Sequence, residues 1–154
     1  MAVELENRIP PPIVAACAAA LMLGMAWVAP ALTFDLPARV PIAIVVAVAG
    51  GSLDLVALAH FLRARTTINP LKPASASALV MGGIYRVTRN PMYLGLATLL
   101  LAWAIYLSSL AALAVLPLFV LYINRFQIAP EERALQARFG AEFDVYRARV
   151  RRWI

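Results

Sequence analysis

The chain has 154 residues but only one cysteine and one histidine. Because Cys17 stands alone, a disulfide within the chain and a cysteine-rich metal site are excluded. Because His60 stands alone, a histidine-rich metal centre is excluded, and a Ser-His-Asp triad would have to use it without a nucleophile-elbow motif. We therefore predict no metal site, and we interpret Cys17 as a small buried residue of an apolar helix.

Nucleotide-binding motifs are missing as well. The sequence contains neither G-x-G-x-x-G nor the phosphate-binding P-loop pattern. Its polar stretches are shorter than about 30 residues, a length that a single βαβ unit already needs. A soluble catalytic domain is therefore excluded.

Charged residues are scarce, at 14% of the chain against 63% hydrophobic residues. Crossing about 30 Å of hydrocarbon takes about 20 apolar residues. The uncharged stretch 92–123 would form a helix of about 48 Å, too long for one crossing. Ser108 and Ser109 near its middle therefore predict a tight hairpin, with Pro117 bending the second arm. We predict four membrane helices, at about 10–32, 40–62, 92–107 and 109–126, the first of them begun by consecutive prolines.

Basic residues gather in two segments on one side of the predicted helices, 63–90 and 127–154, whereas the opposite loops carry only Arg39. By the positive-inside rule, both segments and both termini lie in the cytoplasm. The net charge of +6 is explained by this bias and by attraction to anionic lipid head groups. Since no nucleic-acid-binding motif is present, we predict membrane lipids and no nucleic acid as partners, and we leave the oligomeric state open.

The second cytoplasmic segment predicts a helix from Pro130 to about Arg149, with two glutamates in its first turn that suit the helix dipole. Its apolar residues recur at spacings of three and four, which is typical of one helix face. This amphipathic helix would lie on the membrane surface or close over 63–90. Residues 1–154 are thus predicted to form one all-α membrane domain. The apolar face consists of Leu135, Phe139, Phe143, Tyr146 and Val150.

The segment 83–95 is polar and rich in proline and glycine, just where the chain enters an apolar run. Gly82 and Gly83 permit a positive φ or a close approach of the backbone to a ligand, and Pro91 suits the first turn of the third helix. Its arginines and tyrosines could simply snorkel to phosphates and form an interfacial belt. Combined with the shaped backbone, they favour a site that holds something polar at the water–membrane interface.

Two blocks of sequence resemble a known family. The first reads Leu79-Val80-x-Gly-Gly-Ile-Tyr-Arg-x-x-Arg-Asn-Pro-Met-Tyr-Leu-Gly95, and the second reads Glu131-Glu132-x-x-Leu135-x-x-x-Phe139-Gly140-x-x-Phe-x-x-Tyr146-x-x-Arg149-Val150. In this order, over about 66–152, they resemble the isoprenylcysteine carboxyl methyltransferase and phospholipid methyltransferase superfamily. Its members are integral membrane enzymes that use S-adenosylmethionine. The resemblance implies cofactor contacts for Leu79, Val80, Tyr85, Asn90, Pro91, Tyr93 and Glu131. To these we add Arg89, which would pair with the methionyl carboxylate or with Glu132.

Two positions depart from the prenylcysteine enzymes of this superfamily. Asn90 stands where those enzymes have His, as in the bacterial phospholipid-methyltransferase-like branch, which suggests a bacterial inner (cytoplasmic) membrane. Gln127 stands where they have an Arg that helps to bind the substrate carboxylate, and Arg125 lies nearly opposite it on a helix. The sequence therefore favours a lipid-like or amphiphilic hydrophobic acceptor over a prenylcysteine carboxylate.

Methyl transfer from a sulfonium needs alignment of the nucleophile and exclusion of water, and no metal. The catalytic residue is left open, with Arg125, Glu132 and Asp54 as candidates. Asp54 is an acid inside a predicted membrane helix, where acids are costly and are functional candidates by default. Two other hypotheses remain: a non-catalytic membrane scaffold or partner subunit, and a membrane reductase on a related fold that would use a nicotinamide cofactor.

Overall fold

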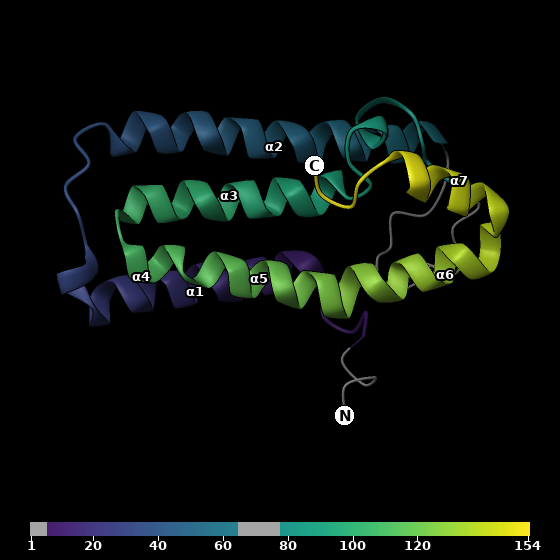
Figure 1. Ribbon diagram of the computed structural model, residues 1–154. Coiled ribbons are helices and arrows are strands. Elements are labelled where there is room, and N and C mark those ends of the chain that lie inside the picture. Colours follow the sequence, from purple (N-terminus) through teal and green to yellow (C-terminus); the bar gives the residue numbers. More distant parts are fainter. Residues whose placement is uncertain (1–5, 65–77) are drawn as a thin grey trace.

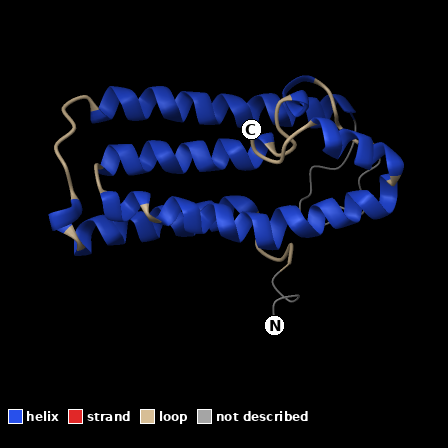
Figure 2. Cartoon of the chain, viewed as in Figure 1, coloured by secondary structure: helices blue, strands red, loops and turns tan. Residues whose placement is uncertain are grey.

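The structure, a computed structural model, describes residues 6–64 and 78–154, which are mostly helical (Figures 1 and 2). In these ranges there is no β-strand, only two isolated bridges. Three helical stretches are long and apolar enough to cross a membrane, and a fourth apolar helix is shorter. The predicted all-α membrane architecture is confirmed. The three stretches are Pro11–Val28, Arg39–Arg63 and Leu110–Phe139, and the shorter helix is Pro91–Leu107.

The first two helices are α1 (Pro11–Val28) and α2 (Arg39–Ala64), with the short helix η2 (Pro30–Leu32) between them. The prolines in the first turn of α1 lack N–H groups that would be unpaired there in any case. Cys17 is exposed on α1, so the prediction that it is buried was wrong. The residues of α1 that pack on the bundle, such as Ala15 and Ala18, lie on the other face of the helix.

A tight hairpin joins α3 (Pro91–Leu107) to α4 (Leu110–Leu113), as predicted. Ser108 ends α3 with a left-handed backbone, at φ +49°, and the Ser109 side chain accepts a hydrogen bond from the backbone N–H of Ala112. The helix is interrupted once more before α5 (Val115–Ile123). Pro117 explains this interruption, because it cannot donate a hydrogen bond to the preceding turn.

Beyond α5 the helix does not stop near residue 126. It continues through a π-helical turn, η5 (Asn124–Ile128), into α6 (Ala129–Phe139). Such π turns let a helix accommodate a proline, here Pro130, without a break. The single helix predicted from Pro130 to about Arg149 is in fact two helices, α6 and α7 (Ala141–Arg149). Gly140 separates them with φ +50° and ψ −121°, a conformation that glycine adopts readily and other residues avoid.

In the bundle, α3 lies between α2 and the group formed by α1, α4 and α5 (Figure 1). The backbones of α2 and α3 approach closely, because a Cβ on Gly50 would lie only 3.0 Å from the carbonyl oxygen of Gly95. On the other side, the indole Nε1 of Trp103 donates to the carbonyl of Ala19 at 3.0 Å and ties α3 to α1. Helix α2 thus occupies one edge of the bundle.

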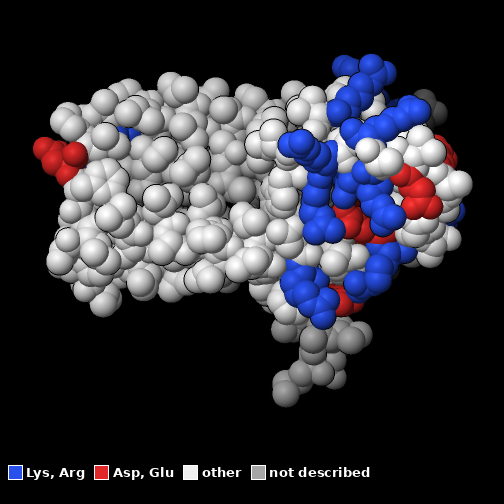
Figure 3. Space-filling model, viewed as in Figure 1, with Lys and Arg blue, Asp and Glu red and all other residues white. Residues whose placement is uncertain are grey.

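Lys and Arg side chains gather at one end of the molecule, which we call the basic end (Figure 3). Here α2 ends, α3 begins, and α6 and α7 lie beyond the apolar helices (Figure 1). The described N-terminal residues lie here too, since the backbone N–H of Asn7 donates to the carbonyl of Phe126 at 3.0 Å. The distribution matches the one-sided basic pattern of the sequence.

Candidate functional site

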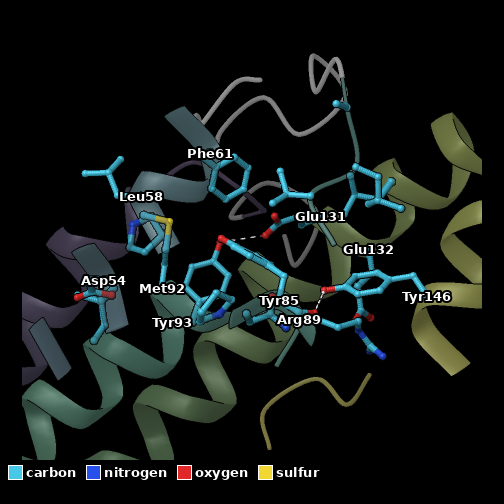
Figure 4. Close-up of a pocket in the computed structure, with 18 of the residues that line it drawn as sticks. Asp54, Leu58, Phe61, Tyr85, Arg89, Met92, Tyr93, Glu131, Glu132 and Tyr146 are labelled. Carbon is cyan, nitrogen blue, oxygen red and sulfur yellow. Dashed lines mark hydrogen bonds and ion pairs between the residues drawn. The ribbon is translucent and has the colours of Figure 1, made fainter. Parts of the chain in front are cut away.

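A cavity of about 500 Å³ lies at the basic end, lined by α2, α3, α6, α7, the start of α1 and the segment before α3 (Figure 4). Its volume falls in the range of about 300–1,000 Å³ that is usual for ligand pockets. The eight residues predicted to contact a cofactor all line it, as do two catalytic candidates, Asp54 and Glu132. The eight residues are Leu79, Val80, Tyr85, Arg89, Asn90, Pro91, Tyr93 and Glu131. The structure brings them together, and their role in binding stays a prediction.

Glu131 and Tyr93 meet in this cavity (Figure 4). The hydroxyl of Tyr93 donates to Oε2 of Glu131 at 3.1 Å. Tyr93 stands in the first turn of α3 and is only 7% exposed, whereas Glu131 stands in the first turn of α6. The hydrogen bond therefore fixes a carboxylate at a position where it lines the cavity.

Glu132, the neighbouring acid, is neutralised by two arginines. Its Oε1 accepts from Arg89 at 2.7 Å and from Nε of Arg152 at 3.1 Å, and its Oε2 accepts from Arg152 at 2.5 Å. Arg89 also donates to the backbone carbonyl of Val150 at 2.6 Å. Of the two partners predicted for Arg89, the structure shows Glu132.

The last residues of the chain, 150–154, fold back over the segment before α3, and we call them the C-terminal strap. The backbone N–H of Arg89 donates to the carbonyl of Arg151 at 3.0 Å. The carbonyl of Arg152 accepts from the Thr88 hydroxyl at 3.2 Å and from the Asn90 side chain at 2.8 Å. Asn90 therefore holds the strap with its amide while it lines the cavity.

The apolar face predicted for the C-terminal segment exists, although it belongs to two helices. Phe143, Tyr146 and Val150 form a buried cluster, against which Leu79 packs. Helices α6 and α7 thus close over the segment before α3, which is one of the two arrangements that the sequence left open. Leu135 and Phe139 complete the cluster.

Tyr85, in the segment before α3, lies next to Tyr146 of α7. The hydroxyl of Tyr146 donates to the backbone carbonyl of Tyr85 at 2.7 Å. Burial raises the pKa of Tyr146 from 10.0 to about 12, and burial together with the Glu131 carboxylate raises the pKa of Tyr85 still further. Both phenols are therefore neutral near pH 7.

Gly83 shows why the segment before α3 needs glycine. Its φ is +59°, and a Cβ at this position would collide with the imidazole ring of His60. The ring is fixed in turn by a 2.8 Å contact between its Nδ1 and the carbonyl of Val56. The His60 ring therefore packs against Gly83 and orients the turn that carries Tyr85.

Arg125 and Gln127 do not line the cavity. Arg125 has a side chain that is 53% exposed and pairs with Glu6 at 3.5 Å. Gln127 is fully buried and donates from Nε2 to the carbonyl of Ile9 at 2.8 Å. The structure therefore places the third catalytic candidate, Arg125, on the outer surface of the basic end.

The cavity also has an apolar end, which sequence reasoning missed. On this side the sequence indicates only Asp54 as a candidate, and it assigns the prolines at the start of α1 to the beginning of a helix. No local pattern marks these residues, because helices distant in sequence bring them together. Arg152 was missed for the same reason and counted only as a basic flank. The apolar end is lined by Pro10, Pro11, Pro12, Leu55, Leu58, Phe61, Met92 and Leu96.

The fold and this cavity define an α-helical membrane protein with a cavity at its basic end that has a polar and an apolar part. The family model described as phospholipid methyltransferase matches residues 38–142, so the chain belongs to the phospholipid methyltransferase family. A protein of Haemophilus influenzae, described as an uncharacterized protein, is 52% identical over 64 residues, which are 41% of this chain and the whole of that relative. No solved structure matches the chain. Family membership implies a methyltransferase.

Proposed function

We propose that this chain transfers a methyl group from S-adenosylmethionine to a lipid-like or amphiphilic acceptor at the cytoplasmic face of the membrane. The cavity carries the proposal, because it joins a polar end at Glu131, Tyr93 and Tyr85 to an apolar end between α1 and α2. A water-soluble donor and an apolar acceptor need such a pair of environments. Family membership supports the reaction class.

The residues at the polar end fit S-adenosylmethionine. The cofactor carries a sulfonium and an ammonium, and Glu131 offers a carboxylate held by Tyr93. Tyr85 and Tyr146 offer aromatic faces for adenine or for a cation. Leu79 and Val80 line the same cavity, and their backbone groups would read the adenine edge.

When bound, the cofactor would supply an electrophilic methyl group with a neutral thioether as leaving group. The protein then has to align the acceptor and exclude water rather than provide strong acid–base help. Helix α7 contributes to this exclusion, since Phe143 and Tyr146 are buried and line the cavity. Arg89 and Glu132 would hold the C-terminal strap in place rather than contact the methyl group.

The basic end would face the cytoplasm, where both the cofactor and anionic lipid head groups are found. The chain would then be a single-domain protein of a bacterial inner membrane with both termini in the cytoplasm. Its hydrophobic acceptor would reach the cavity from the bilayer, because the apolar end includes Leu55, which is 68% exposed on α2.

Calorimetric binding of S-adenosylhomocysteine to the detergent-purified protein tests the cofactor. Glu131→Gln and Tyr93→Phe should each weaken binding, and loss of a charge-assisted contact worth about 1.5–3 kcal/mol corresponds to about ten- to a hundredfold. Glu142→Gln is the matched control, because Glu142 is exposed on α7 and does not line the cavity. Arg125→Gln should also bind normally.

Two results would contradict the proposal. Wild-type protein that binds a nicotinamide cofactor in place of S-adenosylhomocysteine would support a reductase, and protein that binds neither would support a scaffold.

The acceptor is tested by transfer of labelled methyl groups into fractionated membrane lipids, beside prenylcysteine analogues and soluble amines. Label found only in a soluble product would refute access from the lipid.

A further inference from the structure

Residues 6–10, which precede α1, lie along the π turn η5, and we call them the N-terminal arm (Figure 1). The backbone N–H of Asn7 donates to the carbonyl of Phe126 at 3.0 Å. Pro130 stands four residues after Phe126 and has no N–H to donate to that carbonyl. The arm therefore supplies the donor that Pro130 cannot, and it is bonded to the backbone of the helix.

Gln127 holds the arm at a second point. Its side chain is fully buried, and its Nε2 donates to the carbonyl of Ile9 at 2.8 Å. Its Oε1 is buried without a hydrogen bond to any described residue, and a buried polar atom without a partner is costly. Packing alone would favour an apolar residue of similar volume at this position. The bond to Ile9 is thus what the glutamine contributes.

Two arginines attach the start of the arm to the same helical stretch. Glu6 has a side chain that is only 16% exposed, and it pairs with Arg125 at 3.5 Å and with Arg133 at 2.5 Å. Arg125 belongs to η5 and Arg133 to α6. Because both arginines are more than half exposed, each pair alone is weak. Added to the two hydrogen bonds, they fix the arm along η5 and α6.

The arm leads directly into prolines that line the apolar end of the cavity. Pro10 has a polyproline backbone, with φ −54° and ψ 133°, and proline rings make such a backbone stiff. Pro10 and the two prolines after it line the cavity together with Leu55 and Leu58 of α2. The position of this proline wall therefore depends on where the arm is attached.

The proline wall limits the room at the apolar end. Helix α1 packs on α3, α4 and α5, and α2 packs on α3, so this end of the cavity has α1 on one side and α2 on the other. The whole cavity measures about 500 Å³, and in the proposed function it holds a cofactor as well as part of an acceptor. A small displacement of the wall would therefore change the width that remains for an apolar tail.

We propose that the N-terminal arm sets the width of the apolar end, and that Gln127 is the positioning residue that fixes the arm. The cavity then admits an unbranched apolar chain better than a branched one. Gln127 and Glu6 do not line the cavity, so they act through the proline wall. The inference rests on the proposed function only in taking the apolar end as the place of the acceptor's tail.

The test compares two alcohols of equal chain length, dodecanol and hexahydrofarnesol, of which only the second carries methyl branches. Their binding to purified protein in lipid nanodiscs is measured without any cofactor, with empty nanodiscs as the blank. Wild-type protein should prefer dodecanol. Gln127→Leu removes the donor to Ile9 and should lower this preference about tenfold, the low end of what one methylene group is worth in an apolar pocket. Glu6→Gln, which leaves the helix interior unchanged, should lower it by a smaller factor.

Hydrogen exchange measures the attachment of the arm directly. The amide of Asn7 is bonded to the carbonyl of Phe126 and should exchange faster in Gln127→Leu and in Glu6→Gln. Ser109→Ala is the control, because it removes a buried hydrogen bond at the hairpin and does not line the cavity. It should change neither the exchange of Asn7 nor the preference for dodecanol.

Two results would overturn the inference. One is a preference for dodecanol that stays at the wild-type value in both Gln127→Leu and Glu6→Gln, whatever the exchange of Asn7. The other is an equal change of preference in Ser109→Ala. Binding of S-adenosylhomocysteine is measured separately. Wild-type protein that fails to bind it would contradict the proposed function and leave the role of the arm intact, because the two alcohols bind without a cofactor.

Discussion

Replacing Glu132 with glutamine should loosen the C-terminal strap and lower the stability of the protein. Glu132 holds Arg89 and Arg152 together, and the side chains of Glu132 and Arg89 are only 16% and 10% exposed. Breaking a fully buried ion pair costs about 3–5 kcal/mol, and an exposed pair contributes at most about 1 kcal/mol. Because Arg152 is 39% exposed, we expect an intermediate loss of about 2 kcal/mol.

For a chain of this length, a loss of about 2 kcal/mol lowers the melting temperature by about 4–8 °C. The assay is thermal unfolding in detergent, with Glu142→Gln as the control that removes the same charge from an exposed position. Hydrogen exchange supplies a local measurement, because the amide of Arg89 is bonded to the carbonyl of Arg151 and should exchange faster in Glu132→Gln.

A double-mutant cycle between Glu132→Gln and Arg152→Gln isolates their interaction. We expect a coupling energy of about 1 kcal/mol, with the remaining loss belonging to Arg89. Equal melting temperatures for Glu132→Gln and Glu142→Gln would refute the reasoning, as would faster exchange in both variants.

Three further outcomes are expected. Gly140→Ala should destabilise the protein by about 1–3 kcal/mol in thermal unfolding through its positive φ alone, since a Cβ there meets open space; an unchanged melting temperature would contradict this. Tyr146→Phe should cost about 1–3 kcal/mol, because the carbonyl of Tyr85 loses its donor. The Tyr146 phenol has a higher pKa in the folded protein than in the unfolded chain, so its contribution to the free energy of unfolding is complete below pH 10 and is lost as the pH rises toward 12. Over this range, Tyr146→Phe should therefore lose less stability than the wild-type protein. Reporter fusions at Asp35 and Ile154 should give periplasmic and cytoplasmic signals respectively, and the reverse would overturn the proposed orientation.

Much of the membrane core could be predicted from the sequence, because apolar runs and turn residues act locally. The hairpin at Ser108 and Ser109 follows from a stretch too long for one crossing, and the start of α3 follows from Pro91. The split between α6 and α7 could not be derived from the apolar spacing. The spacing continues across Gly140, whereas the backbone there turns sharply.

The candidate site was predictable only where its residues lie in the two sequence blocks. Tyr93 and Glu131 belong to these blocks, and the structure brings them into contact. Leu58 and Pro11 reach the same cavity from helices whose sequence carries no sign of it. Which residues of these helices line the cavity depends on how the helices pack. They can therefore be identified only from the packed arrangement of α1, α2 and α3.

The π turn η5 determines the direction in which the side chains of α6 point around the helix axis. A π turn amounts to one extra residue in an α-helix, and each residue of an α-helix advances the rotation by about 100°. Without that residue, Glu131 and Glu132 would point about 100° away from their present direction, while α5 would keep its packing in the bundle. Single-residue insertions or deletions in this turn would therefore re-aim both carboxylates without rebuilding the membrane core, which gives this fold a simple route to altered sites.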